Sequence, residues 1–408
     1  MSDWKEYKLK DVAYLTTGFP FDGHKYGKDG VRVVRGDNVT IGSLRWDPEK
    51  DKRWSEPFER SQEFSLKADD IVIGMDGSRV GKNRAQVKAS DLPLLLAQRV
   101  ACVRHNDLSI QSFLYYQIFN DKFEKYIKAV QTGTSIPHVS LKQIGDYPII
   151  LPPLSVQYKI SDVLKYLDDK IECNRRINEN LEQQAQALFK SWFVDFEPFK
   201  GQPFVESELG MIPQGWRVEN LSSIADYVNG LAMQKFRPVD GERGLPVLKI
   251  KELGQGSVDN NSELCSPSLI GEKYIIDDGD IIFSWSGTLI VKVWCGGKCG
   301  LNQHLFVVIP KDNPKWFVYQ WTNYHLDNFI RIAKDKAVTM GHIKRGELDK
   351  AMVVVPDKVN MQRIDDLMTP IFNQMISIEQ ESRRLAELRD TLLPKLMSGD
   401  LQISDIDL

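Results

Sequence analysis

Two long stretches of the chain place hydrophobic residues with the alternating four-three spacing of a heptad repeat. The first stretch has these positions at Ile160, Leu164, Leu167, Ile171, Asn174, Asn178, Leu181, Ala185, Leu188 and Trp192. The second stretch follows about 204 residues later, at Ile364, Met368, Ile371, Met375, Ile378, Ser382, Leu385, Arg389, Leu392 and Leu396. Apolar residues fill eight of the ten positions in each row, where a hydrophobic content of 42% supplies about four. The pattern predicts two long helices that pair as a coiled coil.

A whole globular segment separates the two stretches, so they can pair only if the chain folds back on itself. We therefore expect an antiparallel pair, with Asn174, Asn178 and Ser382 fixing its register. Ser155 is the expected N-cap of the first helix, and Asp357 or Asn360 that of the second. Because Pro394 lies inside the second pattern, a kink or break is expected near Leu393.

The segments before the two helices also repeat each other, at an offset that shrinks from about 212 to 204 residues. Matching segments are Leu9–Gly18 with Leu221–Gly230, Val31–Arg35 with Leu245–Lys249, Asp70–Ser78 with Asp280–Thr288, and Asp146–Leu151 with Lys350–Val355. Most of these runs are typical of buried strands that end in turns, and helix is expected around Ile110–Ala129. The predicted fold is α+β, with two similar globular units separated by a long antiparallel two-helix coiled coil and related by a pseudo-two-fold internal repeat.

A length of 408 residues is too great for one core. We expect globular units at 1–154 and 201–356, with long helices at 155–200 and 357–408. No apolar run approaches the ~20 residues of a membrane helix, and the first residues do not resemble a signal peptide. Five scattered cysteines fit a reducing compartment. The expected location is the cytoplasm.

The net charge of −3 hides a local concentration of positive charge. Residues 79–104 contain a single acid, Asp91, against Arg79, Lys82, Arg84, Lys88, Arg99 and Arg104. Such a patch favours a nucleic-acid partner, because local fields matter more than the sum of charges. The same residues would also suit a solvated basic face.

Motifs for catalysis are missing from the sequence. It contains no phosphate-binding Gly-x-x-x-x-Gly-Lys loop, no Gly-x-Gly-x-x-Gly, no Gly-x-Ser-x-Gly and no His-Glu-x-x-His. Cys295 and Cys299 have only His304 near them, whereas structural zinc needs four ligands, so they are better explained as flanking a hairpin turn. We expect no metal site, no cofactor in this chain and no catalysis by this chain alone.

Three repeated places carry side chains suited to DNA, which is read by donors on loops backed by phosphate contacts. The first holds Asp76, Gly77, Ser78, Arg79 and Lys82, with Arg84 close behind, and its second copy holds Ser284, Trp285, Ser286, Gly287 and Thr288. The second pairs Gln98 and Arg99 with Gln303 and His304. The third pairs Thr134, Ser135 and His138 with Thr339, His342 and Lys344. Ordinary hairpin chemistry would also explain the glycines and hydroxyls.

Aromatic residues gather at the end of the first long helix, at Trp192, Phe193 and Phe196. They would either plug the junction between the helix and a globular unit or form a docking surface for a partner subunit.

Several of these segments resemble one protein family, the specificity subunits of type I restriction-modification systems. Leu188–Pro198 resembles the family's central region, Leu209–Trp216 its linker into the second recognition domain, Leu388–Gly399 its C-terminal region and Pro152–Gln157 its helix entry. The likeness covers the whole chain in order. Gly18-Phe-Pro also resembles the family's first loop, whereas Gly230 is followed by Leu-Ala-Met.

The resemblance implies a non-catalytic subunit with two target-recognition domains, each reading half of a bipartite sequence in double-stranded DNA. The paired helices would set the unread spacer through Ile160, Leu164, Leu167, Ile171, Leu181 and Leu188 against Ile371, Met375, Ile378, Leu385 and Leu392. Two modification subunits would carry S-adenosylmethionine, and restriction subunits would use ATP and magnesium. A coiled-coil adaptor whose globular ends bind proteins is the alternative.

Overall fold

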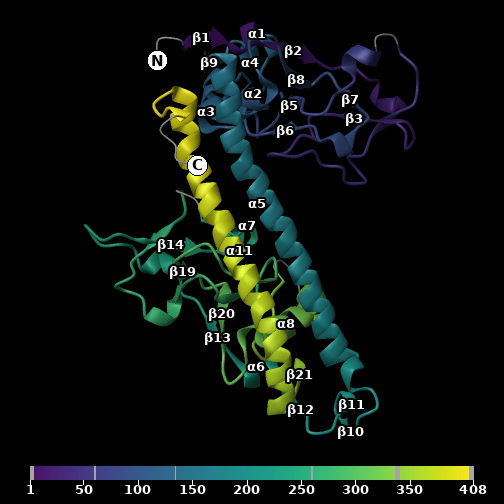
Figure 1. Ribbon diagram of the computed structural model, residues 1–408, viewed down its shortest axis with the longest axis vertical. Coiled ribbons are helices and arrows are strands. Elements are labelled where there is room, and N and C mark those ends of the chain that lie inside the picture. Colours follow the sequence, from purple (N-terminus) through teal and green to yellow (C-terminus); the bar gives the residue numbers. More distant parts are fainter. Residues whose placement is uncertain (1–3, 59–60, 134, 259–260, 336–340, 404–408) are drawn as a thin grey trace. The chain divides into compact units, whose positions relative to one another are not determined.

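The structure is a computed structural model that describes residues 4–58, 61–133, 135–258, 261–335 and 341–403 (Figure 1). The chain divides into two compact units. Unit 1 consists of Met1–Asp168 with Glu387–Leu408, and unit 2 of Asp169–Ala386. Because both long helices contribute to both units, the division of the chain into four domains remains a prediction.

Unit 1 is built on two small sheets and a strand pair. A four-stranded antiparallel sheet has the order β2-β8-β5-β6, and a three-stranded sheet the order β4-β3-β7, in which β3 and β7 run parallel. The remaining pair is β1 with β9. The strands are β1 (Lys5–Lys8), β2 (Ala13–Thr17), β3 (Val31–Val34), β4 (Arg53–Trp54), β5 (Ile71–Gly74), β6 (Arg84–Gln86), β7 (Leu94–Leu96), β8 (Val100–His105) and β9 (Pro148–Leu151).

Short helices cover the larger sheet of unit 1. They are α1 (Leu9–Val12), α2 (Gln111–Ile118), α3 (Asp121–Val130) and α4 (Leu141–Gly145). The helix expected around Ile110–Ala129 is therefore two helices. They divide at Asn120, whose side chain accepts a hydrogen bond from the Phe123 amide at 2.9 Å and so caps α3. Phe113 and Phe123 are fully buried in the core beneath the sheet.

Unit 2 repeats this plan, with one more strand, β16, in its second sheet. Its sheets have the orders β13-β20-β17-β18 and β15-β14-β19-β16, β12 pairs with β21, and β14 runs parallel to β19. The strands are β12 (Arg217–Asn220), β13 (Ala225–Asn229), β14 (Leu245–Leu248), β15 (Leu264–Cys265), β16 (Ile275–Ile276), β17 (Ile281–Ser284), β18 (Ile290–Val293), β19 (Cys299–Leu301), β20 (Leu305–Pro310) and β21 (Met352–Val355). The predicted internal repeat is confirmed.

The remaining elements of unit 2 are helices and a hairpin. The helices are α6 (Leu221–Ile224), α7 (Ile250–Gln255), α8 (Lys315–Tyr324), α9 (Leu326–Asp335) and α10 (Gly346–Asp349), and the hairpin is β10 (Phe204–Ser207) with β11 (Gly210–Pro213). Helix α7 lies between β14 and β15, where unit 1 has an irregular loop between β3 and β4. The two copies therefore differ most in this connection.

A glycine at the same place in each unit permits a close approach of two backbones. A Cβ on Gly18 would lie 2.0 Å from the Leu96 carbonyl oxygen, and one on Gly230 would lie 2.3 Å from that of Leu301. The next residue in each copy forms a parallel bridge, Phe19 with Ala97 and Leu231 with Asn302. The loop after Gly230 therefore keeps the backbone path of its counterpart although its side chains differ.

The two long helices are α5 (Leu154–Phe189) and α11 (Lys358–Ser398). None of the twenty predicted seam positions is exposed, whereas most residues between them are. Within unit 2 the Asn174 amide donates to Glu381 at 2.8 Å, and the Asn178 amide donates to the Met375 carbonyl at 3.2 Å. The pairing is antiparallel, and Asn174 and Asn178 contact the opposite helix as predicted, whereas the Ser382 hydroxyl donates to the Ile378 carbonyl of its own helix at 2.9 Å.

The helix ends agree with the sequence in part. Asp357 caps α11 by accepting hydrogen bonds from two main-chain amides, and Gly399 follows the helix in the left-handed conformation. Ser155 was the wrong N-cap, because α5 begins one residue earlier and the Pro153 carbonyl accepts its first bonds. The expected break at Pro394 is also wrong. Helix α11 continues to Ser398, and the burial of Leu396 and Met397 offsets a proline cost of about 3 kcal/mol.

In the part of the chain that the structure describes, no helix combines the length and the apolar character needed to cross a membrane.

The stability of unit 2 should depend on the protonation of His325. Burial lowers the pKa of this imidazole below its ordinary value of 6.5, opposed by a hydrogen bond to the Met352 carbonyl. The unfolded chain therefore binds the proton at a higher pH than the folded unit does, and stability is lost as the pH falls below 6.5.

We predict that His325→Gln, which keeps an N–H donor, flattens this pH dependence. Urea denaturation of wild type and variant, followed by tryptophan fluorescence between about pH 7.5 and pH 5, measures the difference. If the free energy of unfolding changes equally with pH in wild type and variant, the prediction is contradicted.

Candidate nucleic-acid interface

The three places predicted in unit 1 meet in the structure. Asp76 pairs with His138 through an antiparallel bridge, and the Gly77 amide donates to the Pro137 carbonyl at 2.9 Å. The Arg99 Nε lies 3.5 Å from Asp76 Oδ2. We call Asp76, Arg99 and His138 cluster 1. Segments that lie far apart in the sequence are thus brought into one cluster.

Main-chain hydrogen bonds fix the base of cluster 1. Strand β5 ends at Gly74, and the next amide, that of Met75, donates to the Arg99 carbonyl at 3.1 Å. The Val139 amide in turn donates to the Met75 carbonyl at 2.9 Å. Gly77 has a φ of +105°, which favours glycine. The cluster therefore stands at the ends of the two central strands of a sheet, β5 and β8, rather than on a free loop.

The side chains around cluster 1 are exposed and largely basic. The exposed candidates are Ser78, Arg79, Lys82, Gln98, Arg99 and Ser135. Lys82 pairs with Glu124 at 3.6 Å, and the Thr132 hydroxyl lies 2.8 Å from His138 Nδ1. Hydroxyls, amides and cations of this kind suit phosphates and base edges. The structure thus brings these predicted residues to one surface, and their contacts with DNA stay a prediction.

Arg84 does not join this surface. Its side chain is buried, its guanidinium donates to the Gly81 carbonyl at 2.9 Å and to the Asn120 carbonyl at 3.3 Å, and it lies over the Phe119 and Phe123 rings. Burial lowers the pKa of this group. Arg84 therefore supports the core of unit 1, and a contact with DNA would require it to leave these partners.

The equivalent residues of unit 2 form a second cluster with the same backbone pairing. Ser286 pairs with His342 through an antiparallel bridge, and the Gly287 amide donates to the Gly341 carbonyl at 2.9 Å. The Ser286 hydroxyl lies 3.1 Å from His304 Nδ1. We call Ser286, His304 and His342 cluster 2. The Asp–Arg ion pair of cluster 1 is thus replaced by a Ser–His hydrogen bond.

A cavity of about 330 Å³ adjoins cluster 2, with Trp285 and Phe306 in its wall and His342, Lys344 and Arg345 beside them. Its aromatic surface and two cations are suited to nucleic acid. Ser284 is buried, and its hydroxyl donates to the Thr288 carbonyl at 2.8 Å, so this residue shapes the turn. Thr288 is exposed and Gln303 half-buried. Sequence reasoning missed Arg345, although its place directly after Lys344 was a signal.

Two predicted residues, Thr134 and Thr339, lie outside the described residues.

The aromatic residues after α5 are packed into the core of unit 2. Trp192 and Phe193 are buried, and Phe193 contacts the rings of Trp216 and Phe317. Phe196 is half-buried against Trp216. The helix passes through a π-helical turn, Lys190–Val194, which directs these rings inward. The predicted docking surface is therefore corrected for Trp192 and Phe193, and the alternative, a plug at the junction, fits the structure.

Cys295 and Cys299 are free and buried. Burial raises the pKa of both thiols to about 12, so they stay protonated at neutral pH and are poor metal ligands. No group of three or more metal-binding side chains occurs among the described residues.

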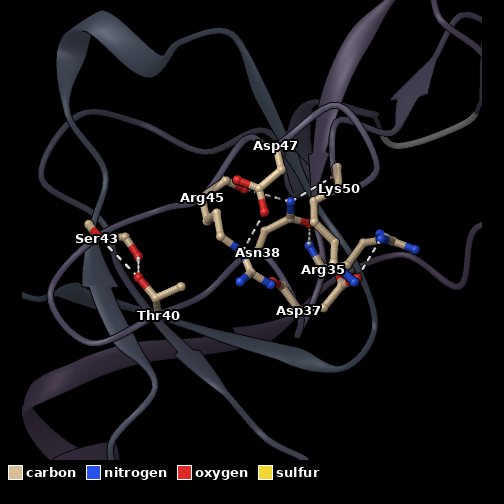
Figure 2. Close-up of polar contacts among 8 residues, drawn as sticks. All are labelled: Arg35, Asp37, Asn38, Thr40, Ser43, Arg45, Asp47 and Lys50. Atoms are coloured by element: carbon tan, nitrogen blue, oxygen red, sulfur yellow. Dashed lines mark hydrogen bonds and ion pairs between the residues drawn. The ribbon is translucent and has the colours of Figure 1, made fainter. Parts of the chain in front are cut away.

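The loop between β3 and β4 is a structural feature that sequence reasoning missed (Figure 2). Its centre is Asn38, which is fully buried and whose amide donates to the Arg45 carbonyl at 3.0 Å and the Lys50 carbonyl at 2.9 Å. Its Oδ1 accepts from the Arg35 amide at 3.0 Å. The signal was the turn-forming sequence Gly36-Asp37-Asn38 directly after a predicted strand.

This loop packs against cluster 1. A Cβ on Gly36 would lie 3.9 Å from the Arg99 carbonyl oxygen. Asp37 accepts from Arg35 at 2.8 Å and from Lys50 at 3.1 Å, which ties the two ends of the loop together. Asn38 and Asp37 therefore hold the shape of this loop, which begins near the main chain of Arg99.

Comparison with known proteins identifies the same family over most of the chain. The family described as "Type I restriction modification DNA specificity domain" matches residues 1–183 and 213–388. The type I restriction enzyme MjaIX specificity subunit of Methanocaldococcus jannaschii is 27% identical over 77% of this chain and 74% of that protein. The HindI specificity subunit of Haemophilus influenzae is 23% identical over 98% of this chain and 100% of that protein.

A solved structure has a similar fold. The crystal structure of the S subunit of a type I restriction-modification system from M. genitalium superposes with a TM-score of 0.57 and 15% identity, over 97% of this chain and 96% of that one.

We predict that Asn38→Ala lowers the free energy of unfolding by about 2–3 kcal/mol, because the buried side-chain amide of Asn38 is lost and two main-chain carbonyls and one main-chain amide lose their partner. Thr40→Ala is the matched control, since it removes an exposed hydroxyl from the same loop and should cost less than about 0.5 kcal/mol. Equilibrium urea denaturation compares the two variants. Equal losses of stability would show that the buried amide does not hold the loop.

Proposed function

The chain belongs to the family of type I restriction-modification DNA specificity proteins, and from this membership we propose that its two units each read one half of a bipartite DNA sequence. It is a specificity subunit and not a catalytic one. The bound partner would be double-stranded DNA, with cluster 1 and cluster 2 at the two contacts.

The observation that carries this proposal is the repetition of one backbone arrangement with different side chains. Each cluster brings together a residue two positions after the end of one strand, the residue directly before another strand of the same sheet, and a bridged histidine. A fold that only supported itself would have no reason to vary the polar members of each set. A reader of two unlike half-sites needs that variation, because base edges differ in their donors and acceptors.

The paired helices would set the distance between the half-sites. The buried seam of α5 and α11, with Asn174 and Asn178 bonded across it, supports a rigid pairing of fixed register. The chain would also hold two modification subunits, which carry S-adenosylmethionine and methylate adenine. Restriction subunits would add ATP- and magnesium-dependent cleavage.

We predict that reversing the charge of Arg79 and Lys82 to Glu weakens DNA binding and its salt dependence. Each lost phosphate contact should reduce the slope of log affinity against log salt by about 0.9. The control reverses Lys28 and Lys67, which are exposed in unit 1 outside cluster 1. Mobility shifts with the modification subunits present, over a range of salt concentrations, measure both. An unchanged slope in the first variant would refute the interface, and an adaptor for proteins would show no such slope in wild type.

We predict that Leu167→Asp with Ile171→Asp abolishes discrimination between spacer lengths, because a carboxylate in the apolar seam costs several kcal/mol. The control places Asp at Gln183 and Gln184, which are exposed on the same helix. Methylation of a DNA library with random spacers, using the assembled complex, gives the preferred length. Wild-type spacer preference in the seam variant would rule out the helices as the ruler.

A further inference from the structure

The ion pair of cluster 1 and the hydrogen bond of cluster 2 occupy equivalent places in the repeat. Asp76 and Ser286 each stand two residues after the end of a strand, β5 and β17. Arg99 and His304 each directly precede the next strand of the same sheet, β8 and β20. One structural position is therefore filled by an arginine held by an acid in unit 1 and by a histidine held by a hydroxyl in unit 2.

Hydrogen bonds hold the main chain around Arg99, whereas its side chain extends into solvent. Its carbonyl accepts from the Met75 amide at 3.1 Å, and the neighbouring Gln98 amide donates to the Phe19 carbonyl at 3.0 Å. The side chain is 67% exposed. Asp76 engages the Nε edge, and among the described residues neither Nη atom has a partner. Two parallel donors therefore remain, which is the geometry that matches O6 and N7 of guanine.

The negative charge of Asp76 favours a base over a phosphate as the target of Arg99. A phosphate bound by this guanidinium would lie close to the Asp76 carboxylate, and the two anions would repel each other. A base edge carries no net charge, and the carboxylate can accept from an amino group of a base beside it. An arginine that served only as a phosphate contact would bind better without this acid.

His304 cannot make the same contact. Its Nδ1 lies 3.1 Å from the Ser286 hydroxyl, and its Nε2 lies 3.3 Å from the Gln303 amide nitrogen. The ring therefore offers one nitrogen at most in place of a two-donor fork, so the equivalent base of the second half-site is read by different chemistry.

We propose that Arg99, positioned by Asp76, is the specificity-determining residue for a guanine in the half-site read by unit 1, and that His304 with Ser286 occupies the equivalent reading position in unit 2. This inference rests on the proposed function and adds to it the base recognised and the residue pair that recognises it.

The test transplants the pair of unit 2 into unit 1 as Asp76→Ser with Arg99→His. The variant is assembled with the modification subunits and allowed to methylate a random DNA library, and the methylated sites are sequenced. One guanine of the first half-site should lose its preference by about 10- to 100-fold. The second half-site and the spacer should stay as in wild type, which also reports that the protein is folded.

Two single variants separate reading from folding. Arg99→Lys keeps the charge but loses the fork, so the same guanine should be relaxed while overall affinity is largely kept. Asp76→Asn keeps the size and removes the charge, so total DNA binding should rise or hold while selectivity for that guanine falls. A merely structural pair would lower binding to every sequence in parallel.

The matched control is the exposed pair Arg45 and Asp47, joined at 3.2 Å in the same unit, changed as Asp47→Ser with Arg45→His. It should leave the sequence preference unchanged. A wild-type complex without any sequence preference would overturn the proposed function itself. If the Asp76→Ser, Arg99→His variant keeps the wild-type sequence preference, only the assignment to Arg99 is overturned. The same holds if the Asp47→Ser, Arg45→His control changes the preference at the same base.

Discussion

The pairing of α5 with α11 is the contact on which both units depend, because within each unit it joins segments from distant parts of the chain. In unit 1 the Arg389 guanidinium donates to Asp168, 221 residues away, at 2.7 Å. In unit 2 Asn174 and Glu381 are 207 residues apart. Leu396 is fully buried in the core of unit 1, a contribution of about 1.5–3 kcal/mol. The core of unit 1 is therefore incomplete without residues from the C-terminal end of the sequence, and the core of unit 2 contains residues of both long helices.

The repeat separates residues that carry the fold from residues that vary. Gly18 and Gly230 are the same because a side chain at either would collide with the facing backbone. Strands β5 and β17 are buried throughout in both copies. Immediately beyond them the residues diverge, from Asp76 to Ser286. A constant backbone therefore presents two different polar surfaces, and specificity can change there at little cost to folding.

The sequence predicted what depends on periodicity and local chemistry. The heptad positions, the strands β3, β5 and β9 with their second copies, and the Asp357 cap follow from rules that act over a few residues. The burial of Arg84 and of Trp192 could not be predicted, because it depends on which distant elements pack over them. The prediction of a helix break at Pro394 was wrong for a related reason. Packing in the core of unit 1 holds the last helical turn, which a proline would otherwise break.

The candidate contacts were predicted as residue types but not as a geometry. Arg99 was one cation among six in a basic stretch, and only the structure shows that Asp76 is beside it. An ion pair this exposed adds at most about 1 kcal/mol to stability, so its place in the molecule is not explained by folding. Its effect is to restrict the guanidinium of Arg99 and to repel a second anion, such as a phosphate, from the same place. In a protein with a net charge of −3, the positions of acidic side chains can thus contribute to DNA selectivity as well as the positions of basic side chains.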